Sequence, residues 1–195
     1  MSTDRLRVTV VVGSVRAGRF GDTVARWVTE QAEHRDDLEV SVVDLAEPAV
    51  AAELALDFAG GTAPEGAPSF RQRLAGADAF VVVTCEYNHG YPASLKLAID
   101  SAKEEWYAKP VGFVSYGGLA GGQRAVEQLR QVFPELHAVT IRETVSFHQY
   151  WEQFGEDGQP RDLEAVNKAA NVLLDQLAWW GVSLKEARAK RPYAG

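Results

Sequence analysis

The stretch Ala79-Phe-Val-Val-Val-Thr-Cys-Glu-Tyr-Asn-His-Gly-Tyr-Pro-Ala-Ser-Leu95 decides the fold. It begins with an apolar run over residues 80–83, the pattern of a strand that is buried on both faces of a sheet. It continues into a polar turn over residues 86–92, and this turn opens a helix. In open α/β sheets, ligands bind where buried strands end at the carboxyl edge. The turn is therefore a candidate ligand-binding loop.

The composition of the chain is that of an ordinary globular domain. It has 195 residues, of which 46% are hydrophobic and 24% are charged. The net charge of -7 argues against nucleic acid or an anionic membrane as the main partner, because both select basic surfaces. The single cysteine, Cys85, excludes an intrachain disulfide framework. With no run of ~20 apolar residues and no signal-type segment after Met1, we expect a cytoplasmic location.

Strand patterns alternate with helical patterns along the chain. Besides the opening stretch, strands are expected at residues 8–12, 38–45, 110–116 and 139–145. The helices between them follow from apolar residues at helical spacing, and the last helix is expected to end at Gly181. This alternation predicts an α/β fold with right-handed crossovers. The flavodoxin-like arrangement fits best: a single domain with a five-stranded parallel sheet of order 2-1-3-4-5 and helices on both faces.

We expect this domain to span residues 1–182 and a basic C-terminal tail to span 183–195. Ser69 is expected to cap a short helix. Two segments follow no readable pattern: residues 46–68, with at most a turn of helix at 51–58, and the aromatic segment 146–158. Long irregular loops inside compact domains are usually functional or disordered, so we expect these segments to frame a pocket.

The loop after strand one has the composition of a phosphate site. It reads Gly13-Ser-Val-Arg-Ala-Gly-Arg-Phe-Gly21 and directly precedes a helix. Backbone N–H groups at a helix start, a hydroxyl group and guanidinium groups together suit a phosphate monoester. The loop lacks the Lys and Ser/Thr of a Walker A motif, and Val15 replaces the middle glycine of a Rossmann fingerprint. The alternative is a tight strand–helix turn with surface arginines.

The loops after strands three and four would lie beside the first loop. Residues 85–91 supply a ring, an amide, an imidazole and a glycine, while no second His or Cys near His89 indicates a metal site. We interpret Cys85 as a small buried side chain. The paired glycines of Ser115-Tyr-Gly-Gly-Leu-Ala-Gly-Gly122 let the backbone approach a planar ligand. The three loops together indicate a mononucleotide with a large heteroaromatic ring, and FMN fits better than a plain nucleotide because no ribose-binding acid lies near them.

These loops resemble those of the NADPH-dependent FMN reductase family, flavodoxin-like flavoproteins that include quinone, azo-dye and chromate reductases. The resemblance rests on residues 13–16 and 18–21, on 86–90 with Pro92, Leu95 and Lys96, and on 115–118. It implies phosphate contacts from the first loop and isoalloxazine contacts from the other two. The implied cofactor-binding residues are Ser14, Arg16, Arg19, Phe20, Gly21, Glu86, Tyr87, Asn88, His89, Gly90, Ser115, Tyr116, Gly117 and Gly118.

The resemblance also implies an activity. The chain would take a hydride from NADPH or NADH onto FMN and reduce a small acceptor: a flavin, quinone, azo compound or metal ion. No side chain needs to act as a nucleophile, so we nominate no catalytic residue. Arg124 is a candidate contact for the 2′-phosphate of NADPH. Relatives usually dimerise through the helix over 93–103, so a homodimer or homotetramer is expected, with Trp106 and Tyr107 near the interface unless they pack in the core.

Two alternatives from other functional classes share this fold. A flavodoxin-type carrier would bind FMN without oxidising nicotinamide, but the first loop carries arginines where such carriers have Ser and Thr. A phosphoacceptor signalling domain would need clustered Asp residues after strands one and three. Those positions read Gly13-Ser14 and Cys85-Glu86.

Overall fold

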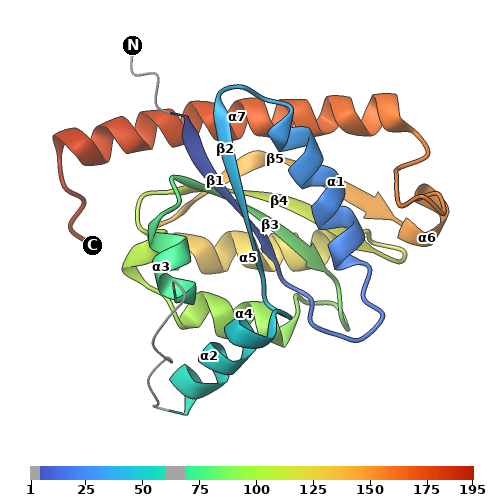
Figure 1. Ribbon diagram of the computed structural model, residues 1–195, viewed down its shortest axis with the longest axis horizontal. Coiled ribbons are helices and arrows are strands. Elements are labelled where there is room, and N and C mark those ends of the chain that lie inside the picture. Colours follow the sequence, from blue (N-terminus) through green and yellow to red (C-terminus); the bar gives the residue numbers. More distant parts are fainter. Residues whose placement is uncertain (1–4, 60–68) are drawn as a thin grey trace.

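The protein is a three-layer α/β domain built on one parallel sheet (Figure 1). The computed structural model describes residues 5–59 and 69–195, so part of the irregular segment 46–68 lies outside the described residues. The sheet has the order β2-β1-β3-β4-β5, and all four pairings are parallel. The predicted flavodoxin-like fold is thereby confirmed, including the edge position of the second strand. The strands are β1 (Leu6–Val12), β2 (Leu38–Asp44), β3 (Ala79–Cys85), β4 (Pro110–Gly117) and β5 (Val139–His148).

Helices cover both faces of this sheet. Helices α1 and α7 pack on one face, where their apolar side chains form one core with the strands. The remaining large helices pack on the other face and form a second core. Strands β3 and β4 are buried along their whole length, because each lies inside the sheet between these two cores. The helices are α1 (Gly21–Glu33), α2 (Pro48–Phe58), α3 (Phe70–Ala75), α4 (Ala93–Asp100), the 3₁₀ turn η1 (Glu104–Trp106), α5 (Gln123–Glu135), α6 (Tyr150–Gln153) and α7 (Leu163–Lys190).

The expected end of the last helix at Gly181 is wrong. Helix α7 continues through Gly181 to Lys190 and has 28 residues. A Cβ atom built on Gly181 would lie 2.6 Å from Leu6 Cδ2, so the glycine lets the helix approach β1 closely. Sequence reasoning took this glycine for a helix end because glycine is a poor helix former. Tertiary contact with β1 is the reason for it.

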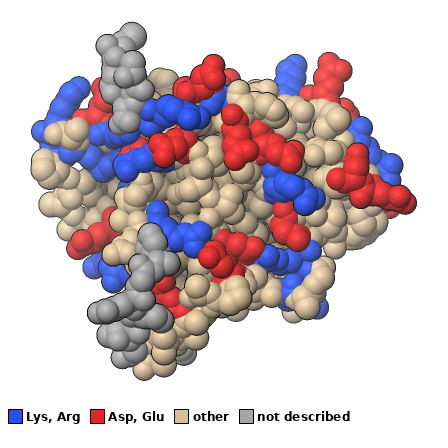
Figure 2. Space-filling model, in the orientation of Figure 1, with Lys and Arg blue, Asp and Glu red and all other residues tan. Residues whose placement is uncertain are grey.

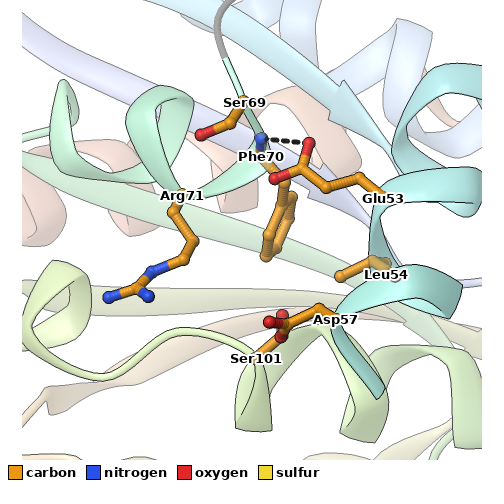
Figure 3. A pocket seen from close by; sticks show the side chains of 7 residues that line it. All are labelled: Glu53, Leu54, Asp57, Ser69, Phe70, Arg71 and Ser101. Carbon is orange, nitrogen blue, oxygen red and sulfur yellow. Dashed lines mark hydrogen bonds between the residues drawn. The ribbon is translucent and has the colours of Figure 1, made fainter. Parts of the chain in front are cut away.

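The segment after β2 is more regular than expected. Helix α2 takes up residues 48–58, where at most a turn of helix was expected. The predicted cap of the next helix is confirmed: Ser69 Oγ accepts from Gln72 N, and the Gln72 side chain accepts from Ser69 N. Figure 3 shows the hollow of about 170 Å³ between these helices. There Glu53 of α2 accepts a hydrogen bond of 2.7 Å from Phe70 N, so this carboxylate fastens the two helices together.

Trp106 belongs to the core and is only 1% exposed. Its ring packs against Phe80 and Phe133, and its Nε1 donates to Ile99 O. Trp106 therefore takes the core position that was the alternative for it, because the indole is enclosed within one chain. Helix α4 is also shorter than the predicted helix over 93–103 and ends at Asp100.

On the face that is turned toward the viewer in Figure 1, acidic and basic side chains are interspersed (Figure 2). Within residues 5–59 and 69–195, no helix has the length and apolarity required to cross a bilayer.

Candidate active site

The first loop is held in place from both sides of the sheet edge. Gly13 N donates to Val83 O over 2.9 Å, which ties the start of the loop to β3. Ser14 is buried, and its hydroxyl forms a 2.9 Å hydrogen bond with the Tyr116 hydroxyl of β4. Arg19 donates to Ser14 O and to the carboxylate of Asp44 at the end of β2. The loop is therefore braced against three strands.

The two loop arginines have different surroundings. The hydrogen bond to Asp44 raises the pKa of Arg19 above its usual value, and this guanidinium is committed to holding the loop. Arg16 is exposed, and its guanidinium lies 5.1 Å from the centroid of the Tyr87 ring. Between them, Ala17 and Gly18 carry almost no side chain, so the main chain lines the space beside α1. Such a loop end at a 13-residue helix is suited to an anion.

The second loop closes into a tight hairpin turn. Tyr87 N donates to Gly90 O and Gly90 N donates to Tyr87 O, over 2.9 and 3.1 Å. The central residues Asn88 and His89 have φ values of 50° and 75°, the left-handed values of a type I′ turn. Gln128 of α5 donates to His89 O and holds the outside of the turn. The turn is thus held by its own main chain and by α5, and His89 is exposed to solvent.

The third loop is compact because its glycines allow close backbone contacts. A Cβ atom on Gly117 would lie 2.9 Å from Gly122 N, and one on Gly122 would lie 2.8 Å from Ser115 Cβ. Gly122 also has a φ of 82°, a value that favours glycine. Ser115 Oγ donates to Gly121 O from a buried position below the loop. Ser115 therefore supports the loop from beneath.

The three loops meet in one pocket of about 300 Å³ at the carboxyl edge of the sheet. Eight of the sequence-predicted residues line it. Of the other six, Ser14, Gly21 and Ser115 are buried, while the turn residues 88–90 are not part of the lining. The lining residues are Arg16, Ala17, Gly18, Arg19, Phe20, Cys85, Glu86, Tyr87, Tyr116, Gly117, Gly118 and Tyr150.

Sequence reasoning did not nominate four of the lining residues: Ala17, Gly18, Cys85 and Tyr150. Cys85 is buried at the end of β3, as predicted, but its side chain also reaches the pocket floor. Tyr150 comes from α6, and its ring lies 4.7 Å from Phe20 and 5.4 Å from Tyr116. The aromatic composition of residues 146–158 was the available signal. It did not indicate which ring faces the pocket.

The floor of the pocket is protonated and uncharged. Burial raises the pKa of the Cys85 thiol and that of the Tyr116 phenol. Burial, together with a hydrogen bond to Cys85, raises the pKa of Tyr87 to about 12. Glu86 is the acidic residue of the lining, and Arg124 donates to its Oε1 over 2.8 Å. The site therefore combines arginines at one end with neutral donors and rings at the other.

This geometry agrees with the comparisons with known proteins. A family model for NADPH-dependent FMN reductases matches residues 6–152. The chain belongs to this family. The predicted family, the FMN cofactor and the class of NAD(P)H-dependent flavin oxidoreductases are therefore confirmed.

Individual relatives point the same way. The chain is 39% identical to an NAD(P)H-dependent FMN reductase of Schizosaccharomyces pombe over 130 residues, which are 65% of this chain and 64% of that protein. It is 30% identical to the NADPH:quinone oxidoreductase of Arabidopsis thaliana over 182 residues, 89% of this chain and 91% of that protein. Among solved structures, the flavoenzyme NAD(P)H:(acceptor) oxidoreductase FerB of Paracoccus denitrificans superposes with a TM-score of 0.67 at 23% identity. This superposition covers 91% of the chain and 98% of FerB, and it shows the shared fold.

Proposed function

We propose that this pocket binds FMN, accepts reducing equivalents from NAD(P)H and passes them to a small quinone or flavin acceptor. The observation that carries the proposal is the convergence of the three loops on one pocket that has arginines at one end and aromatic and glycine surfaces at the other. The relatives named FMN reductase and quinone oxidoreductase support the same acceptor classes.

The residues present fit FMN. Arg16 would pair with the phosphate, and the main chain at Ala17 and Gly18 would donate to it. The cradle is too tight for a side chain at Gly21, because a Cβ there would contact Ser14 Oγ and lie 2.8 Å from the Tyr116 hydroxyl. The glycine surface at Gly117 and Gly118 leaves space for a flat ring. When bound, FMN supplies the redox chemistry, because its ring accepts a hydride and can release electrons.

The protein's own part is to bind and orient FMN and to stabilise its reduced ring. Tyr87 and Tyr116 keep their hydroxyl protons over the physiological range, since the pKa of each is raised, so each hydroxyl would be able to donate a hydrogen bond. The neutral thiol of Cys85 places no negative charge on the pocket floor. A reduced flavin ring carries negative charge, so a neutral floor with donors favours it. The Glu86 carboxylate is compensated by Arg124.

The direct test is spectroscopic. The purified protein should be yellow, and its flavin absorbance should disappear when NADPH or NADH is added without oxygen. Steady-state NAD(P)H oxidation in the presence of a quinone should follow. A colourless protein that takes up no FMN would refute the proposal. Binding of FMN without NAD(P)H oxidation would favour the carrier alternative.

We include two further features in the proposal: a cytoplasmic location and a homodimer, or a tetramer built from it, formed through α4. An apolar hollow of about 260 Å³ beside α4 supports the dimer, because it leaves Val15 and Leu97 partly exposed. Light scattering should give at least twice the 21.3 kDa mass of one chain. Leu97→Asp should yield the monomer, and a monomeric wild-type protein would remove this part of the proposal.

A further inference from the structure

A continuous line of aromatic rings runs from the core to the mouth of the pocket. Neighbouring ring centroids along it are 4.7 to 5.2 Å apart. The inner end is buried, whereas the outer end, Trp151 of α6, is 57% exposed. In order, the rings belong to Trp27, Phe147, Phe154, Phe20, Tyr150 and Trp151.

The indole of Trp151 lies at the rim of the active-site pocket. Its neighbour Tyr150 lines the pocket wall. A Cβ atom built on Gly118 would lie 3.6 Å from Trp151 Cη2, so the indole sits against the glycine surface of the third loop. Leu119, the next residue of that loop, is 82% exposed. Two large apolar side chains are therefore presented to solvent beside the pocket.

The short helix that carries Trp151 is fixed in position. Gln149 N donates to Gly118 O over 2.9 Å, and His148 Nδ1 forms a 3.0 Å hydrogen bond with Leu119 O. Arg161 donates from its backbone to Gln153 O at the other end of α6. Gln149 has a φ of 45°, a left-handed value that costs a non-glycine residue free energy. The chain thus holds the Trp151 indole at one place beside the pocket. It does so although the exposed apolar ring and the left-handed backbone at Gln149 are both unfavourable.

We propose that Trp151 is the platform on which a planar quinone acceptor stacks during its reduction. This inference rests on the proposed function and names a specificity-determining residue for it. NAD(P)H gives up a hydride, and the quinone gains two electrons and two protons, the second proton coming from water. An aromatic pair contributes about 0.5–1.5 kcal/mol beyond the area that it buries, which corresponds to a two- to twelvefold change in affinity. A compact anionic acceptor such as ferricyanide has no flat face and gains nothing from the indole.

The test compares Trp151→Leu and Trp151→Phe with the matched control Trp179→Leu. Trp179 is 64% exposed on α7, where its ring packs against Trp180, whereas Trp151 lies against Gly118 of the pocket. Trp151→Leu should raise KM for 1,4-naphthoquinone three- to tenfold and leave the kinetics with ferricyanide unchanged. Trp151→Phe should stay within twofold of wild type for both acceptors. Trp179→Leu should change neither.

A second readout does not depend on turnover. Equilibrium dialysis of oxidised 1,4-naphthoquinone against the FMN-loaded protein, without NAD(P)H, should show the same three- to tenfold loss in Trp151→Leu. An unchanged dissociation constant, or an equal loss with ferricyanide, would overturn the platform. The platform alone is refuted if the wild-type protein oxidises NAD(P)H with ferricyanide and Trp151→Leu binds the quinone as tightly as the wild type. A wild-type protein that binds no FMN refutes the proposed function and the platform together.

Discussion

Replacing His89 by glycine is expected to stabilise the protein. His89 is the second central residue of the turn over residues 87–90, with a φ of 75°. An L-residue in the left-handed region costs about 1–2 kcal/mol, which glycine avoids. Glycine adds about 0.4–1 kcal/mol of conformational freedom to the unfolded chain, so the net gain should be about 0.5–1 kcal/mol. For a domain of this size, each kcal/mol corresponds to about 2–4 °C in Tm.

The assay is urea unfolding of wild type, His89→Gly, His89→Val and a control, His34→Gly. His34 is exposed at the end of α1 with a φ of -67°, where glycine relieves nothing. We expect the midpoint to rise for His89→Gly and to fall for His89→Val and His34→Gly. A fall for His89→Gly equal to that of the control would refute the strain argument. The dissociation constant for FMN should stay within twofold in His89→Gly, because the backbone contact from Gln128 to His89 O is retained.

The remaining predictions concern the cradle, the phosphate and a buried lysine. Gly21→Ala should lower the free energy of unfolding by about 2–3 kcal/mol, because its Cβ displaces the buried pair Ser14 and Tyr116. Gly76→Ala should be nearly neutral, because a Cβ there meets only ordinary contacts, at 3.6 Å from Arg73 O and Gln72 O. Equal losses of stability in the two variants, measured by denaturation, would contradict this. Arg16→Ala should weaken FMN binding about ten- to a hundredfold and leave riboflavin binding within twofold, since a charge-assisted hydrogen bond contributes about 1.5–3 kcal/mol; equal losses for both ligands in titration would remove Arg16 from the phosphate site. Burial lowers the pKa of Lys109 from 10.5 to about 8, so between these pH values the unfolded state binds more protons and the stability due to this residue rises with pH. The unfolding free energy of the wild type minus that of Lys109→Met should therefore increase from pH 8 to 10. A value that is independent of pH would show that Lys109 keeps its ordinary pKa.

The topology was predictable because it depends on local patterns. Short apolar runs that alternate with segments of helical periodicity specify a parallel sheet. A ligand-type loop directly after the first strand favours the flavodoxin-like strand order. The loops of the site were predictable for the same reason, since the carboxyl ends of parallel strands share one edge. The end of β5, expected at residue 145, was not predictable. The strand extends to His148, where its last residues pair with Ser115, Tyr116 and Gly117, and no local signal marks that extension.

Features that depend on distant contacts were not predictable. A glycine such as Gly181 is typical of a helix end. Here a glycine is needed because the Leu6 side chain, at the start of the chain, leaves no space for a Cβ atom. Trp106 follows a one-sided helix, and its burial depends on Phe80 and Phe133 from two other elements. Tyr150 enters the pocket through its contact with Phe20 of the first loop. In each case the deciding neighbour lies far away in sequence, where periodicity carries no information.

The pair formed by Arg19 and Asp44 links the phosphate loop to the edge of the sheet. Asp44 is the last residue of β2, and its carboxylate also accepts from Ala46 N, which begins the path toward α2. Among the residues that the structure describes, strand β2 pairs along one side only, with β1. We therefore expect an anion bound in the loop also to favour the docked position of this outer strand. FMN binding should then slow the hydrogen exchange of the β2 amides, because a ligand that binds only the docked state lowers the population of the open one.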